Sequence, residues 1–134
     1  MNLNTVHTVS IKTQLSSPLR HIEIFQLHEP DHTTTLVLKL SNGIHIGWGE
    51  YRMLTSPPTD LVKWAATYHH LAGMNAIQAI DYLVRCGESW HPAKVHLMES
   101  ALLDLCNTIE PTPCTYPIHD LTNLAIAYYI FILE

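Results

Sequence analysis

The apolar residues of this chain recur at every second position before Pro57-Pro58 and at every third or fourth position after it. The first pattern is clearest between residues 35 and 50, where apolar residues occupy positions 36, 38 and 40 and then positions 44, 46 and 48. A period of two is that of a half-buried strand. Asn42-Gly43 lies between the two runs and predicts a β-hairpin with a type I′ turn, in which both turn residues have positive φ.

Two earlier segments are also expected to be extended. Polar and apolar residues alternate from residue 8 to residue 15, and again, less regularly, from residue 21 to residue 27, where Gln26 interrupts the apolar face. A loop is expected at Glu29-Pro30-Asp31.

After Pro57-Pro58 the pattern predicts three helices. The first is capped by Thr59 or Asp60 and ends near Gly73, and the second covers residues 75–85 and ends at Gly87. The third begins at Pro92, and its apolar stripe consists of Val95, Met98, Ala101, Leu102, Leu105 and Cys106. Strands followed by helices predict an α+β fold, with an antiparallel meander of three to four strands followed by about three α-helices.

The segment of residues 124–133 differs from the other predicted strands because it is apolar on both faces. Such a strand is typical of a parallel sheet or barrel that is covered on both sides. It follows a connector, residues 110–117, that contains three prolines. No neighbouring strand is expected for it in this chain, so we expect self-association through this C-terminal strand. Truncation after Pro117 is expected to give a more nearly monomeric protein that still folds.

Length and charge exclude several classes of function. The chain has 134 residues, the size of one domain, and a formal net charge of −5 without a basic run, so nucleic acid is not an expected partner. No signal-peptide pattern is present, and the longest apolar run is too short to span a bilayer, so no membrane association is expected. The cysteines, Cys86, Cys106 and Cys114, form no C-x-x-C pair. A reducing, cytoplasmic location fits this pattern.

The ten histidines do not show the spacing of a metal site. His69 and His70 are adjacent and point about 100° apart on a helix, and His28 and His32 lie on either side of Pro30. No metal ligand is predicted in this chain.

Three short motifs stand in order along the chain: Ser17-Pro18-Leu19, then Asn42-Gly43 with Gly47-Trp48-Gly49-Glu50, then Glu99-Ser100-Ala101-Leu102-Leu103-Asp104-Leu105. They resemble the Thr-Pro-Phe, "D-G-x-x-G-x-G-E" and "E-x-A-L-W-D-L" segments of the N-terminal capping domain of the enolase superfamily, of the mandelate racemase and muconate-lactonising type. The hairpin motif is the most specific of the three.

The resemblance implies that residues 1–110 are a capping domain and residues 111–134 are a connector and the first strand of a (β/α) barrel that this chain lacks. In that family, barrel residues and Mg²⁺ promote abstraction of a proton α to a carboxylate. The resemblance therefore implies no catalytic residue, metal ligand or cofactor in this chain, and Mg²⁺ only in an enzyme that includes the barrel. The barrel domain and a small carboxylate substrate are the implied partners.

The cap of that family acts as a lid whose two loops close over the barrel and touch the substrate. By position, the first loop includes Leu19, Arg20 and His21, and the second includes Tyr51, Arg52 and Met53. Arg20 can pair with a substrate carboxylate or can be an ordinary solvated side chain. Glu50 and Asp104 are expected to be structural carboxylates rather than catalysts.

The sequence is therefore interpreted as a non-catalytic substrate-specificity lid of an enolase-superfamily enzyme. The alternative is a free-standing, non-enzymatic binding module that has the cap fold. The C-terminal strand discriminates between them, because a free-standing module is not expected to keep a strand that is apolar on both faces.

Overall fold

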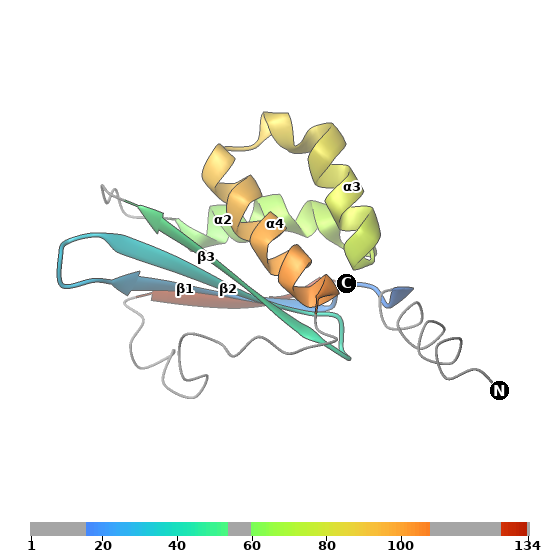
Figure 1. Ribbon diagram of the computed structural model, residues 1–134, viewed down its shortest axis with the longest axis horizontal. Coiled ribbons are helices and arrows are strands. Elements are labelled where there is room, and N and C mark those ends of the chain that lie inside the picture. Colours follow the sequence, from blue (N-terminus) through green and yellow to red (C-terminus); the bar gives the residue numbers. More distant parts are fainter. Residues whose placement is uncertain (1–15, 54–59, 108–126, 134) are drawn as a thin grey trace.

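One antiparallel sheet carries helices on one of its sides in the computed structural model of this protein (Figure 1). The structure describes residues 16–53, 60–107 and 127–133. The described strands are β1 (His21–His28), β2 (Thr34–Ser41), β3 (Ile46–Met53) and β4 (Ala127–Ile132), in the spatial order β3-β2-β1-β4. The helices are α2 (Leu61–Tyr68), α3 (Ala76–Cys86) and α4 (Pro92–Cys106), with 3-10 turns η1 (His69–Leu71) and η2 (Gly87–Ser89). The α+β prediction, with a meander followed by helices, is confirmed.

The alternation along the strands gives the sheet two distinct faces. The face toward the helices contributes buried residues to the main core, which are Ile22, Ile24, Leu36, Leu38 and Leu40. Helices α2 and α4 supply the other side of this core with Trp64, Tyr68, Leu97, Met98 and Leu102. The opposite face of the sheet has its own small cluster of Phe25, Leu27 and Val37, against which Trp48 packs.

The helices begin where the sequence predicts, and each has a side-chain cap. The Asp60 carboxylate accepts the first free N–H groups of α2. Asn75 and Gln78 form a capping box at the start of α3, and Pro92 follows the His91 cap at the first position of α4. These caps satisfy N–H groups that have no partner within the helix.

The hairpin between β2 and β3 is present, but the predicted type I′ turn is wrong. Gly43 has a positive φ of 88°, whereas Asn42 is not among the described residues with positive φ. Asn42 is instead buried, and its side-chain oxygen accepts the N–H groups of Ile44 at 3.0 Å and His45 at 2.8 Å. The Asn42 side chain thus holds the loop. Asparagine is common in turns both because it tolerates a positive φ and because its side chain bonds nearby backbone N–H groups, and Asn42 acts in the second way.

The expectation that the C-terminal strand lacks a neighbour in this chain is also wrong. β4 pairs antiparallel with β1, with Ile24 opposite Tyr129 and His21 opposite Ile132. The following residue, Leu133, is buried in the main core. The sheet itself has buried apolar residues on both faces. A strand that is apolar on both faces, such as β4, therefore fits into it. Truncation after Pro117 would remove this strand, so a fully folded remainder is no longer expected.

Some predictions lie outside the described residues. These are the strand at residues 8–15, the connector at residues 110–117 and the first positions of the segment 124–133. Among the residues that are described, none belongs to a helix that is both long enough and apolar enough to cross a bilayer.

Candidate functional site

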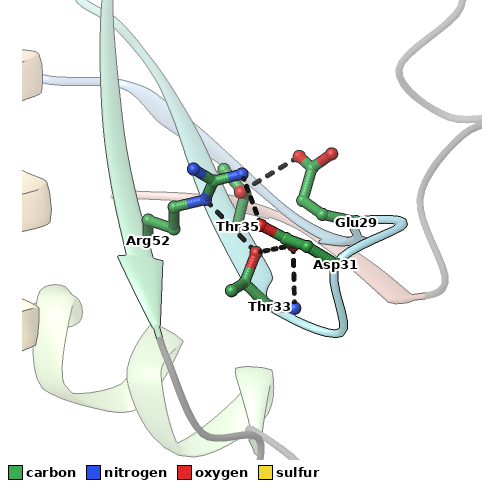
Figure 2. Close-up of polar contacts among 5 residues, drawn as sticks. All are labelled: Glu29, Asp31, Thr33, Thr35 and Arg52. Atoms are coloured by element: carbon green, nitrogen blue, oxygen red, sulfur yellow. Dashed lines mark hydrogen bonds and ion pairs between the residues drawn. The ribbon is translucent and has the colours of Figure 1, made fainter.

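A group of polar side chains meets at one end of the sheet, where the β1–β2 loop approaches the end of β3 (Figure 2). We call this group the Arg52 cluster; it consists of Glu29, Asp31, Thr33, Thr35 and Arg52. The Arg52 guanidinium donates from Nε to Thr33 Oγ1 at 3.2 Å and from a terminal nitrogen to Asp31 Oδ2 at 3.5 Å. The buried Thr35 hydroxyl donates to Glu29 Oε1 at 3.1 Å.

The loop that carries Asp31 is closed by its own hydrogen bonds. The Asp31 carboxylate accepts the backbone N–H of Thr33 at 3.1 Å and its hydroxyl at 2.6 Å. His32, between them, has a φ of 66°, and the Glu29 N–H reaches the Thr33 carbonyl at 2.9 Å. An aspartate that bonds the backbone two residues on is a common means of closing a turn. Here it directs a carboxylate and a hydroxyl toward Arg52.

The hydrogen bonds from Thr33 lower the pKa of Asp31 below its usual 3.8, and the positive charge of Arg52 lowers it further. Asp31 is therefore ionised at neutral pH. Because both members of the Asp31–Arg52 pair have side chains 57% exposed, solvent screens their attraction. The pair orients the guanidinium more than it stabilises the fold.

Arg52 can still bind an anion in this arrangement. Its contacts with described residues use Nε and one terminal nitrogen, and the other terminal nitrogen has no partner within residues 16–53, 60–107 and 127–133. A planar guanidinium held on one side presents donors in a fixed direction on the other side. A carboxylate or phosphate is the kind of group that such donors fit.

The first predicted loop lies at the other end of the sheet from Arg52. His21 begins β1 opposite Ser41, whereas Arg52 lies opposite Thr35. Six residues of β2 separate these positions, a distance of about 20 Å at 3.4 Å per residue. Within this chain, the two predicted substrate loops are therefore not brought together.

The other two residues of that loop have structural contacts. Leu19 is buried, and its N–H donates to the Met74 carbonyl at 2.8 Å. The Arg20 side chain lies beside the hairpin loop, since a Cβ atom added to Gly43 would be 3.1 Å from Arg20 Cδ. Arg20 itself is exposed.

The hairpin motif and the helix motif contact each other directly. A Cβ atom at Gly47 would overlap the Ala101 carbonyl oxygen, and one at Gly49 would overlap the Leu97 carbonyl oxygen. Helix α4 therefore packs on β3 at backbone distance, which only glycine permits. The Asp104 carboxylate accepts the Trp48 N–H at 2.8 Å. Asp104 is half-buried, and its carboxylate links α4 to β3 through this hydrogen bond.

The remaining motif residues divide between core and surface. Leu102 and Leu105 are buried in the main core. Glu50 is exposed on β3, on the face of the sheet opposite to the helices. Glu99 lies at a shallow depression of about 420 Å³ between the end of α3 and the start of α4, which Leu83 and Trp90 also line. Tyr51 packs edge to face against His96 on α4, with ring centroids 5.3 Å apart.

Sequence reasoning missed most of the Arg52 cluster. It placed a loop at residues 29–31 and named Arg52, but it did not connect the two. The signal was Asp31-x-Thr33, a spacing at which the carboxylate closes a turn on the threonine. The pairing of Thr35 with Arg52 across β2 and β3 follows only once the hairpin register is known.

No described residues form a metal site. The rings of His28 and His32 are 6.1 Å apart, but residues 16–53, 60–107 and 127–133 contain no group of three or more potential ligands. The Arg52 cluster also does not suit Mg²⁺, because its central charge is positive.

Comparison of the chain with family models, with curated proteins and with solved structures gave no match. The class of the protein therefore rests on its own fold, an α+β domain with an antiparallel sheet covered by helices on one side.

Proposed function

We propose that this chain is a capping domain of the enolase-superfamily type, which covers the substrate site of a barrel domain and presents Arg52 to a carboxylate. The observation that carries the proposal is the fixed position of Arg52 at the end of β3, where Thr33 and Asp31 hold one side of the guanidinium. This is the place at which the resembling caps have their second substrate loop.

The motif residues support a non-catalytic role. Gly47 and Gly49 let α4 pack on β3 at backbone distance, and Asp104 links the two elements through the Trp48 N–H, so these motif residues have structural contacts. The barrel domain would provide the base and Mg²⁺, and the isolated chain would be inactive. The free thiols of Cys86 and Cys106 accord with a cytoplasmic location for this isomerase or lyase component.

The proposal is tested first by the DNA that follows codon 134. An in-frame continuation with a Lys-x-Lys strand and spaced acidic residues would support a cap joined to a barrel. A continuation with an unrelated fold would refute it.

Steady-state kinetics of the barrel-containing enzyme then test Arg52 itself. Loss of a hydrogen bond to a charged group corresponds to about a 10- to 100-fold rise in KM for the carboxylate in Arg52→Ala, with partial recovery in Arg52→Lys. Arg85→Ala is the matched control, because Arg85 forms an exposed ion pair with Asp81 on α3, at 2.7 Å. Equal KM values for Arg52→Ala and Arg85→Ala would remove Arg52 from substrate binding.

A second candidate is a free-standing module that binds an anionic ligand without a barrel. The pairing of β4 with β1 and the burial of Leu133 favour it, because they give this strand a neighbour within the chain. NMR titration of the isolated chain with a dicarboxylate separates the two functions. Saturable shifts at Arg52 below about 1 mM, with a stop codon after residue 134, would support the module. A lid without its barrel should show no saturation.

A further inference from the structure

The outer edge of β4 is an uncovered edge strand as far as the described residues extend. We infer that two copies of the chain pair through this edge, so that their sheets join across a two-fold axis. This inference does not depend on the function proposed for Arg52.

The backbone of β4 determines which groups face outward. The Leu133 N–H donates to the Arg20 carbonyl at 2.7 Å, and neighbouring residues of an antiparallel strand direct their N–H groups to opposite sides. Tyr129 is an even number of residues from Leu133, so its backbone N–H and C=O groups also point toward β1. Ile130 and Ile132 direct theirs away from β1.

The side chains on the outward-facing residues are apolar and accessible. Ile130 is 51% exposed and Ile132 is 62% exposed, and the register places both on the face of the sheet opposite to the helices. Residues 127–132 contain no charge and no proline. Edge strands that remain monomeric usually carry a charge, a proline or a bulge that prevents pairing. β4 has none of these sequence features that blunt an edge.

The other edge of the sheet is protected. On β3, the outward N–H of Trp48 is taken by the Asp104 carboxylate at 2.8 Å, and α4 packs against the strand at Gly47 and Gly49. Glu50 and Arg52 add exposed charges to this edge. Because the described strands leave one open edge on each copy, association is expected to stop at a pair instead of growing into a filament.

A second copy suits this edge better than an unrelated peptide. Two-fold symmetry places the same segment opposite itself, so any charge in β4 would face an equal charge, and β4 has none. The apolar side chains of Ile130 and Ile132 then lie beside those of the partner copy. The formal net charge of −5 on each copy opposes approach, so added salt should strengthen the pair.

Sedimentation equilibrium of the full chain from about 2 to about 200 µM tests the inference by mass action. We expect a monomer–dimer equilibrium that shifts toward the dimer with salt. Ile130→Lys should weaken dimerisation by at least about tenfold, because it places two like charges at the junction. The matched control is Val84→Lys, because Val84 is 76% exposed on α3. This variant should dimerise as the parent chain does.

Amide hydrogen exchange in the parent chain gives a readout that needs no substitution. On dilution to the monomer, the Ile130 and Ile132 amides should lose protection while those of Tyr129 and Leu133 keep it. A monomer at the highest concentration would overturn the inference. So would equal weakening by Ile130→Lys and Val84→Lys, or protection of the Ile130 and Ile132 amides in the diluted monomer.

Discussion

Replacement of Gly47 by alanine should separate helix α4 from strand β3. An added Cβ atom would overlap the Ala101 carbonyl oxygen and would lie 2.7 Å from both the backbone nitrogen and the Cβ of Leu105. These neighbours are mostly backbone, so they cannot rotate away as the end of a flexible side chain can. Either the helix or the strand must move.

The size of the effect follows from the packing. Overpacking of a tight core contact costs about 1 to 3 kcal/mol, and a shift of even 0.5 to 1 Å loses about a quarter to a half of the dispersion energy of the displaced contacts. Replacing a glycine also lowers the conformational entropy of the unfolded chain, and this stabilising effect offsets about 0.4 to 1 kcal/mol of the overpacking cost. Taking the middle of both ranges, we expect a net loss of about 1.3 kcal/mol in the free energy of unfolding, or about 1 M in the urea midpoint.

Gly87→Ala is the matched control in the same urea denaturation experiment. Gly87 has a φ of −66°, and an added Cβ would meet Val95 Cγ2 at an ordinary 3.4 Å. Alanine there should leave stability unchanged or raise it by up to about 1 kcal/mol. Equal midpoints for Gly47→Ala and the parent would show that α4 does not rest directly on β3. Equal losses in both variants would mean that the contact at Gly47 is not the cause.

Three further predictions concern hydrogen bonds to carboxyl and amide side chains. Asn42→Ala should lower the free energy of unfolding by about 1 to 3 kcal/mol because two loop N–H groups lose their acceptor, whereas Asn42→Asp keeps an acceptor and should lose less; urea denaturation compares them. Asp104→Ala leaves the Trp48 N–H without its acceptor and should cost about 1 to 3 kcal/mol, with Asp104→Asn intermediate in the same assay. Thr33→Val should raise the pKa of Asp31 toward 3.8, because Thr33 is the main cause of its lowering, and carbon-detected NMR titration measures it. A carboxyl whose pKa is lower in the folded state stabilises the fold at pH values above its pKa in the unfolded state, and this stabilisation is lost as the pH falls through its pKa in the folded state. The free energy of unfolding should therefore depend less on pH in the acid range in Thr33→Val.

The strands and helices could be predicted from the sequence because the residue patterns that specify them are local. The alternation on both sides of Asn42-Gly43 and the cap residues Asp60 and Asn75 correspond to observed strands and helix starts. The turn type was wrong because Asn-Gly favours a type I′ turn, whereas the buried Asn42 side chain stabilises a different loop. The burial of the Asn42 side chain in the folded chain, which the local sequence does not show, therefore decided which of the two loop conformations forms.

The position of β4 could not be read from its composition. A strand that is apolar on both faces fits a barrel, but it also fits a sheet whose second face carries Phe25, Leu27 and Val37. Only the long-range pairing with β1 distinguishes these cases. The Arg52 cluster was missed for a related reason, since Asp31 and Arg52 are 21 residues apart and meet only through the register of the sheet.

The two proposals place their partners on different parts of the sheet. Arg52 lies at the end of β3, and the inferred pairing edge is β4, with β2 and β1 between them. Three strand spacings separate these edges by about 14 Å. The Arg52 cluster therefore remains accessible in both copies of the pair, and a pair of caps can present two equivalent guanidinium groups at once. Dimerisation that raised the KM of a barrel-containing enzyme would mean that the two surfaces overlap, whereas an unchanged KM in Ile130→Lys would show that they act independently.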